Sequence, residues 1–429
     1  MRFSASPLEL VTAFVSAVIG GLALTTPISL AWAEGTSTLQ MELLGYSMPR
    51  ATAIGCLIAV LVAAFASAAN SRRVAWWVSV AGVAILLVNH LLGAISATMA
   101  PLTTLNYVDS MAGGVLLGGV AAATVTRLLP AVVFTLGALL SLALGDVSVS
   151  ASDAGAPVRN SPVFGFIVDS PPLWLIWPTV ALAVLCALRG PRVDALDTSV
   201  DLPLRPILAA LVTTTVPLLG SEWLARHGST LLHIMLVVAA TVLSGTVAAL
   251  LLPDRDGLLL LQTIALSAVG GAIVFTAESN WLVPMLVGAC SGGLWLGARW
   301  SLPPLGMAAT VGLAGLALLV GDTQGTVLAA AGVVLAGVTG YCFTASMPVQ
   351  GASLMLGIAM LFVPGLVVAM HGRVFRQTGR PRMYAEPGLL SDVTPGFAAL
   401  VVSLGCAVGF LLVRRLRRPA TDRSPEGDA

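Results

Sequence analysis

The sequence has no lysine and little charge of either sign. Of its 429 residues 10% are charged, all 21 basic residues are arginine, and the formal net charge is +1. Soluble domains carry about 25% charged residues. A chain with so few charges is not a soluble globular protein, and its near-neutral balance gives no sign of a nucleic-acid partner.

Several chemical motifs are missing as well. The sequence contains no phosphate-binding glycine loop, no HExxH and no GxSxG motif, so it does not use ATP directly. Its cysteines lie singly in apolar runs without the spacing of a metal site, and we interpret them as small buried hydrophobic residues: Cys56, Cys186, Cys290, Cys342 and Cys406. We therefore expect no metal, no cofactor and no enzymatic activity.

Long apolar runs fill most of the chain. Hydrophobic residues make up 57% of it, and the mean hydropathy is +0.96. A membrane-spanning helix needs about 20 mostly apolar residues, whereas barrel strands would alternate polar and apolar positions, which these runs do not. We predict an all-α polytopic membrane protein with about fourteen spans, at 8–31, 51–69, 74–98, 109–126, 128–146, 172–189, 205–225, 230–252, 257–276, 281–298, 302–320, 325–345, 350–370 and 394–413.

The arginines predict the orientation, because loops rich in arginine stay in the cytoplasm. With a cytoplasmic N-terminus and alternating loops, 14 of the 21 arginines lie inside; the outer loop 371–393, which holds Arg373, Arg376, Arg380 and Arg382, is the exception. We expect a multi-pass protein of a bacterial plasma membrane with both termini in the cytoplasm. An alternative start stays open, since "AWAEG" after the first run resembles a signal-peptide cleavage site, which would leave thirteen spans.

Two spans carry nearly the same string. Residues 113–118 read GGVLLG and residues 292–297 read GGLWLG, six spans further on, and the short basic loops "NSRRVAWW" and "LLPDRDGLL" are also six spans apart. A parallel repeat of two six-helix halves is typical of transporters. In each span two glycines one turn apart form a groove in which another helix can pack closely: Gly114 and Gly118, and Gly293 and Gly297.

With these features the chain resembles the major facilitator superfamily, closest in layout to its fourteen-span multidrug:proton antiporters. "ASAANSRRVAWW" keeps the arginines of the family's basic loop motif, and "PDRDG" keeps an Asp–Arg pair. The stretches "STLQMELLGYSMPRATAIG", "LLGSEWLARHGSTLLHIML" and "LLSDVTPGFAALVVSLG" resemble that group too. The resemblance implies a major-facilitator-like fold, with two six-helix bundles that alternate access and an extra helix pair.

The sequence departs from that family in several places. Its fourth span has Asp109 near the place of the family's arginine, and its fifth lacks the glycine–proline motif. The acidic residue that the exporters place in the first span is absent from "FVSAVIGGLALTTPISLAW". The family's extra pair lies mid-chain, whereas the six-span repeat puts it at the C-terminal end. The repeat predicts an N-terminal six-helix bundle at 1–190, a cytoplasmic linker at 191–204, a second six-helix bundle at 205–345, an additional helix pair with an outer Arg-rich loop at 346–413, and a cytoplasmic tail at 414–429.

Few polar residues fall within the spans, and each is a candidate for a substrate or proton pathway. Glu222 lies about one and a half turns past Pro217, and "TTTVP" adds hydroxyls, among them that of Thr214, next to a hinge. Glu222 either exchanges a proton for a cation or simply faces water. The other candidates are Asn89 and His90, which alternatively bond a neighbouring helix, and Asp109, which alternatively ends a loop.

The two basic inner loops hold Arg72, Arg73, Asp254 and Arg255. Ion pairs between these residues and helix ends would latch an inner gate. The arginines would equally serve to set the topology without any particular partner. Both interpretations stay open at the level of the sequence.

The sequence thus predicts a transporter that moves a small hydrophobic or amphipathic molecule across the membrane by alternating access, as proton-coupled export. One alternative is a membrane-embedded transferase for lipid-linked substrates, with Glu34 and Glu42 in its first outer loop. Another is a non-transporting scaffold with a partner in the cell envelope. We expect a monomer whose partners are the small-molecule substrate and the lipid bilayer.

Overall fold

The structure is a computed structural model that describes residues 6–25, 38–96, 101–153, 171–190, 204–227, 230–273, 281–320, 326–370 and 394–417. These residues form fifteen helices and no strands. Eleven segments among them are long and apolar enough to cross a membrane, and a twelfth, Leu173–Arg189, is apolar but shorter. The prediction of an all-α polytopic membrane protein is confirmed.

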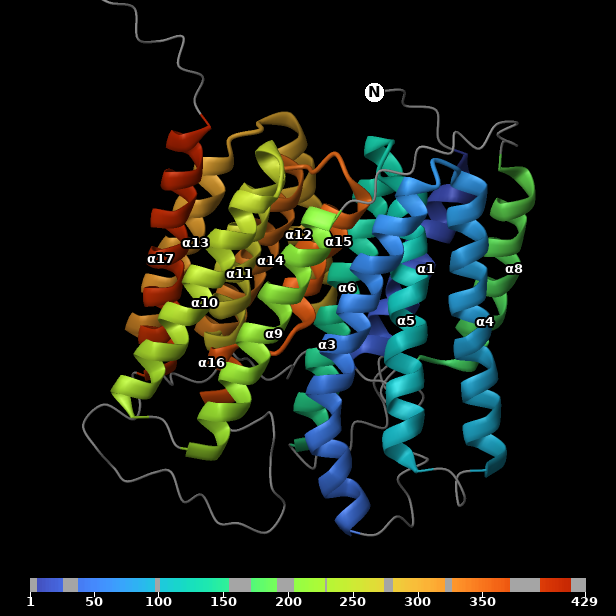
Figure 1. Cartoon of the computed structure of the whole chain (residues 1–429), viewed down its shortest axis with the longest axis horizontal. Coiled ribbons are helices and arrows are strands. Elements are labelled where there is room, and N and C mark those ends of the chain that lie inside the picture. The colour runs from blue at the N-terminus through green and yellow to red at the C-terminus, as the bar shows by residue number, and fades with distance from the viewer. Residues whose placement is uncertain are drawn as a thin grey trace, which may run out of the picture.

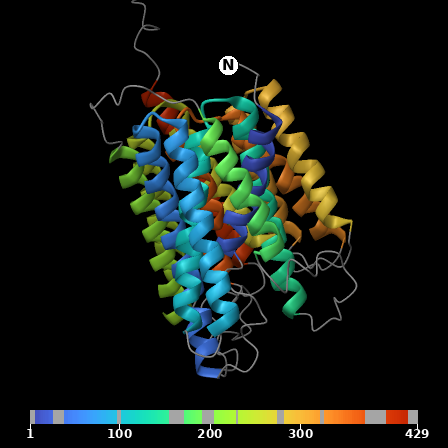
Figure 2. The ribbon, with the colours of Figure 1, turned by 90° about the vertical axis from the view of Figure 1, so that its right-hand side faces the viewer.

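Each of the fourteen predicted spans overlaps a helix, and the thirteenth overlaps two, α15 and α16. The helices run side by side along one direction of the molecule (Figures 1 and 2). They are α1 (Pro7–Thr25), α3 (Thr38–Ala68), α4 (Arg72–Ser96), α5 (Leu102–Thr124), α6 (Leu128–Asp153), α8 (Leu173–Arg189), α9 (Leu204–His227), α10 (Leu231–Leu251), α11 (Asp254–Ala272), α12 (Leu282–Arg299), α13 (Pro303–Val320), α14 (Thr326–Ala345), α15 (Gly351–Phe362), α16 (Leu366–Met370) and α17 (Thr394–Leu416).

Local sequence explains several helix ends. Pro101, Pro172 and Pro253 stand directly before α5, α8 and α11, where a residue without a backbone N–H loses no helical hydrogen bond. Asn70 sits in the turn between α3 and α4 with a φ of 48°, a left-handed conformation that asparagine tolerates better than most residues. This residue allows the chain to reverse direction within a very short turn.

The first six helices form one bundle with a definite pairing. α3 packs along α5, α4 packs along α5 and α8, and α1 packs against α5, α6 and α8. These helices occupy one side of the molecule (Figure 1, blue to green).

The last helices repeat this pairing. α12 packs along α14, α13 packs against α14 and α17, and α11 packs against α14, α15 and α17. Helices α11, α12, α13, α14, α15–α16 and α17 therefore correspond in order to α1, α3, α4, α5, α6 and α8. The chain contains two bundles with one packing scheme.

Helices α9 and α10 stand outside both bundles. They pack against each other; α9 also contacts α3, α15 and α16, and α10 contacts α11 and α17. This pairing differs from the sequence-based division, which put the second bundle at 205–345 and the additional pair at 346–413. The helices within 346–413 complete the second bundle, and the pair outside the bundles lies in the middle of the chain.

The two glycine strings explain why the sequence-based division began the second bundle at the wrong helix. A Cβ at Gly114 would lie 2.2 Å from the Gly55 carbonyl oxygen on α3, and a Cβ at Gly293 would lie 1.9 Å from the Gly337 carbonyl oxygen on α14. Gly118 and Gly297 approach the same two partner helices. The strings thus lie at equivalent interfaces, α3–α5 and α12–α14, but on opposite partners. They mark close helix contact and not the offset of the repeat.

Helix α15 fills the space between the two bundles. All its residues except Leu361 are buried, and it packs against α3, α5, α6, α9 and α11. α15 is apolar on all sides, and in this fold every side packs against protein. The second contact between the bundles is that of α6 with α12 and α14.

Two adjacent glycines of α12 provide a matched test of this packing. Gly293→Ala drives a methyl group into the backbone of α14 and is expected to destabilise the protein by about 3 kcal/mol. Gly292→Ala meets no atom within 4 Å and is expected to be neutral or to stabilise by up to about 1 kcal/mol. Unfolding of both variants in detergent, followed by far-UV circular dichroism, measures the difference. Equal stabilities would contradict the α12–α14 contact.

Candidate functional site

Three predicted residues from two spans form one buried cluster. Asn89 and His90 on α4 and Asp109 on α5 are buried, and Asp109 is 0% exposed. Asn89 Nδ2 donates to Asp109 Oδ1 at 2.8 Å and to the Leu105 carbonyl oxygen at 3.0 Å. His90 Nδ1 lies 3.6 Å from Asp109 Oδ1 and 3.2 Å from the Leu86 carbonyl oxygen. Asp109 is therefore an interior carboxylate and not the solvated end of a loop.

The cluster continues toward α3 through residues that the sequence analysis missed. Asn106 lies three residues before Asp109, on the same face of α5, and its Nδ2 donates to Ser47 Oγ on α3 at 3.4 Å. Within the described part of the chain, Asp109 Oδ2 and Asn106 Oδ1 have no hydrogen-bond partner. A carboxylate oxygen without a donor is costly in the interior of a membrane protein, which favours a group that changes protonation or partner.

Glu222 lies apart from this cluster, at the contact of α9 with α3. Arg50 binds it with two nitrogens: Nε donates to Oε2 at 3.3 Å, and Nη2 donates to Oε1. Arg226, one turn further along α9, also donates to Oε1. The Glu222 side chain is 10% exposed, while those of Arg50 and Arg226 are 41% and 52% exposed. Through Arg50, Glu222 thus joins the first bundle to the additional pair. The sequence did not show that Glu222 and Arg50 form an ion pair.

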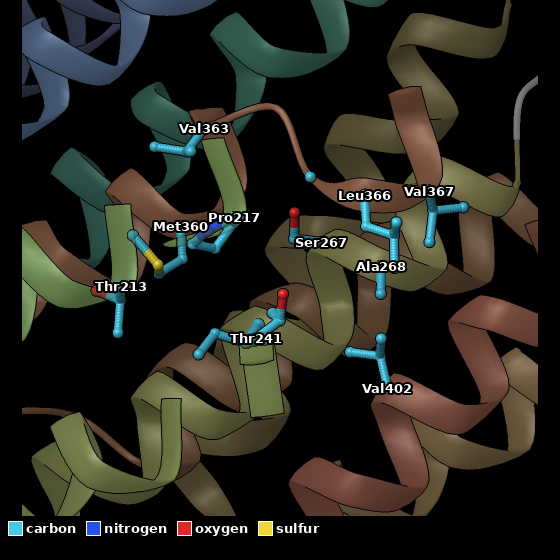
Figure 3. Close-up of a pocket in the computed structure, with 12 residues that line it drawn as sticks. Thr213, Pro217, Thr241, Ser267, Ala268, Met360, Val363, Leu366, Val367 and Val402 are labelled. Atoms are coloured by element: carbon cyan, nitrogen blue, oxygen red, sulfur yellow. The ribbon is translucent and has the colours of Figure 1, made fainter. Parts of the chain in front are cut away.

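Thr214 and Pro217 occupy a third place, in the middle of α9. Thr214 is buried, and its hydroxyl has no hydrogen-bond partner among the described residues. Pro217 faces a small cavity of about 30 Å³ between α9, α10 and the second bundle (Figure 3). Glu222 does not line this cavity. Its lining residues are Thr213, Pro217, Thr241, Ile264, Ser267, Ala268, Met360, Val363, Gly365, Leu366, Val367 and Val402.

Arg72 has a partner that the sequence analysis overlooked. Glu9, in the first turn of α1, is buried and accepts from Arg72 Nη2 through Oε1 and from Arg127 Nη1 through Oε2, the latter at 3.2 Å. Arg72 Nε also donates to the Ala123 carbonyl oxygen at 3.1 Å. Glu9 therefore joins the start of α1, the start of α4 and the turn between α5 and α6. These contacts all lie within the first bundle.

The equivalent contacts of the second bundle are weaker. Arg255 Nη1 lies 3.4 Å from Ser301 Oγ, and Ser301 Oγ donates to the Ala345 carbonyl oxygen at 2.8 Å. Arg255 thereby joins the start of α11 to the α12–α13 turn and the end of α14. Arg73 lies against Gly190, at the end of α8. None of these contacts joins one bundle to the other.

Some predicted features lie outside the described residues. The structure does not describe Glu34, the 191–203 part of the linker, the loop 371–393 with its four arginines, or the tail beyond residue 417. The side chains of Glu42 and Asp254 are likewise outside the described part. Their assignments stay predictions.

Comparison with known proteins gives only distant similarities. No protein-family model matches the sequence, and no curated protein matches it. Among the solved structures that are similar in shape are the xylose transporter XylE from E. coli in a partially occluded inward-open conformation (12% identity, TM-score 0.45, 97% of each chain covered), a bacterial homologue of the human lysosomal transporter Spinster (13%, 0.41, 96% of each) and an auto-inhibited POT family peptide transporter (12%, 0.45, 99% of this chain and 98% of that one).

Proposed function

We propose that the protein is a transporter that exports a small hydrophobic or amphipathic molecule across the plasma membrane by alternating access. The observation that carries this proposal is the repeated pairing of α1–α8 and α11–α17. Two bundles that share one packing scheme and meet through few helices can rock against each other around a site between them. In this proposal α9 and α10 form the additional pair, and both termini face the cytoplasm.

The contacts at the proposed cytoplasmic ends of the helices favour such rigid-body movement. Glu9 clamps three segments of the first bundle, and Arg255 with Ser301 joins three segments of the second. Because neither set of contacts crosses between the bundles, we assign Arg72 and Arg255 to holding each bundle rigid. They do not latch one bundle to the other.

We further propose that export is driven by protons and that Asp109 carries the proton. Asp109 is fully buried, has a histidine within 3.6 Å and has one carboxylate oxygen without a donor in the described structure. Glu222 already faces two arginines, so its charge is compensated in place. We therefore assign Glu222 to anchoring α9 on α3, with the hinge at Pro217 beside it, instead of carrying the proton.

Purified protein in liposomes with an imposed pH gradient tests the function, with a lipophilic cationic dye as substrate. Wild type is expected to move the dye several times faster than protein-free liposomes, and a protonophore should abolish the difference. Glu222→Gln is expected to keep this proton dependence and to change the rate by no more than about threefold, since ion pairs with half-exposed arginines contribute little.

Three outcomes would contradict parts of this proposal. Loss of proton dependence in Glu222→Gln, with the protein still folded, would make Glu222 the proton carrier. Wild-type rates equal to those of protein-free liposomes would reject dye export. A covalent product from a lipid-linked substrate would favour the transferase.

A further inference from the structure

The cavity that Pro217 faces is too small for an organic ligand but large enough for water. Its volume is about 30 Å³, which gives room for one or two water molecules. Its walls come from α9, α10, α11, α17, α15, α16 and the break between the last two (Figure 3). The cavity therefore lies where the additional pair meets the second bundle, whereas Asp109 and its partners lie on α3, α4 and α5.

Two hydroxyl groups from different helices face this small space. Those of Thr241 on α10 and Ser267 on α11 point toward it (Figure 3). Thr241 is only 6% exposed, and its hydroxyl oxygen has no hydrogen-bond partner among the described residues. A buried hydroxyl without a partner is destabilising, and an ordered water commonly fills that role where no protein group does.

Two prolines remove helical hydrogen bonds beside the same cavity. Pro217 has no backbone N–H to donate to the Thr213 carbonyl oxygen, and Pro364 has none to donate to that of Met360. Thr213, Pro217 and Met360 all line the cavity. Proline breaks are tolerated in membrane-spanning helices because hydroxyl side chains and ordered waters satisfy the freed backbone groups. The cavity thus brings two hydroxyls and two proline breaks to one place.

We propose that one or two water molecules bind in this cavity and bridge the Thr241 hydroxyl to the Ser267 hydroxyl. The bound water satisfies Thr241 and solvates the two proline breaks. The additional pair is then held to the first bundle by the Glu222–Arg50 ion pair and to the second bundle by a water bridge. This inference does not depend on the proposed export, because it needs neither Asp109 nor movement of the bundles.

X-ray footprinting of the full chain in lipid nanodiscs tests for this water. Radiolysis turns bound water into hydroxyl radicals, which oxidise a methionine sulfur beside it. Met360 lines the cavity, whereas Met355 on the same helix does not, and the two are similarly buried, at 4% and 0% exposed. Mass spectrometry should therefore find Met360 oxidised several times faster than Met355. Equally slow oxidation of both would show that the cavity is dry and would overturn the proposal.

Two variants remove the water by different routes. Thr241→Val keeps the shape but removes the hydroxyl, and should slow Met360 oxidation about two- to tenfold, the effect of one lost hydrogen bond. Gly365→Ala adds a methyl group to the lining, 3.6 Å from Ser267 Oγ and without a clash, and should slow it as well. Met360 oxidation that stays as fast as in wild type in both variants would contradict the water bridge.

The matched control is Thr246→Val on the same helix as Thr241. The Thr246 hydroxyl already donates to the Val242 carbonyl oxygen at 2.8 Å and does not line the cavity, so Met360 oxidation should match that of wild type.

Thermal unfolding of Thr241→Val gives a second, independent readout. In a dry cavity this substitution replaces an unsatisfied buried hydroxyl with a methyl group and should raise the Tm. With water bound it breaks a hydrogen bond, so we expect a Tm below that of wild type. A Tm above that of wild type would overturn the proposal.

Discussion

Replacing Asp109 by asparagine is expected to lower proton-driven export about 100-fold while the protein stays folded, since a positioned proton-transfer group commonly contributes a factor of this size. The asparagine side chain keeps an oxygen that can accept from Asn89 Nδ2, but it cannot take up or release a proton. It also removes an incompletely paired buried charge, so the fold should not suffer. Exchange of dye for dye without a pH gradient, which moves no net proton, should stay within about threefold of wild type.

The neighbouring residue supplies the control for this prediction. Ser110 is fully buried on the same helix, and its hydroxyl has no hydrogen-bond partner in the described part of the chain, so Ser110→Ala breaks no hydrogen bond there. Its export should remain proton-driven at the wild-type rate. Measurements in the same liposomes, with and without a pH gradient, separate the two variants. Undiminished proton-driven export by Asp109→Asn would show that another group carries the proton.

The second large effect is expected from Glu9→Gln. This substitution leaves Arg72 and Arg127 facing each other without the carboxylate that both contact. Removing one partner of a buried ion pair is strongly destabilising; because both arginines are partly exposed, we expect a loss of about 2–4 kcal/mol. The Tm of the detergent-solubilised protein should fall by about 2–4 °C.

Two further variants isolate the charge effect at Glu9. Adding Arg127→Gln to Glu9→Gln removes one of the two like charges and should restore part of the lost Tm. Arg189→Gln, at an exposed position in the last turn of α8, should change the Tm by less than about 1 °C. A Tm of Glu9→Gln equal to that of wild type would show that Arg72 serves only to set the topology.

The number and length of the helices follow from the sequence, because a bilayer requires about 20 apolar residues for each span and satisfies no exposed backbone group. The fourteen predicted ranges overlap the helices for that reason. Even the break between α15 and α16 is marked by Pro364 within an apolar run.

The candidate site was only partly predictable. Asn89, His90 and Asp109 each stand out as polar residues in apolar runs, but nothing local shows that they meet. A signal does exist: Asn89 lies seven residues before the end of α4 and Asp109 seven residues after the start of α5, so an antiparallel helix pair brings them to the same depth. Glu9 went unnoticed because one acidic residue at the start of a span is ordinary. Its structural role depends on two arginines from other segments, which the sequence does not place beside it.

The sequence by itself determined which segments cross the membrane and which polar residues lie within them, since hydropathy and helix length are local properties. Only the tertiary structure decided which helices pair, that α9 and α10 stand outside the bundles, and that Glu222 faces Arg50 while Asp109 faces Asn89 and His90. In a bilayer every apolar helix has nearly the same surface chemistry. Pairing therefore depends on close fits such as Gly293 against Gly337, which exist only once two helices have met.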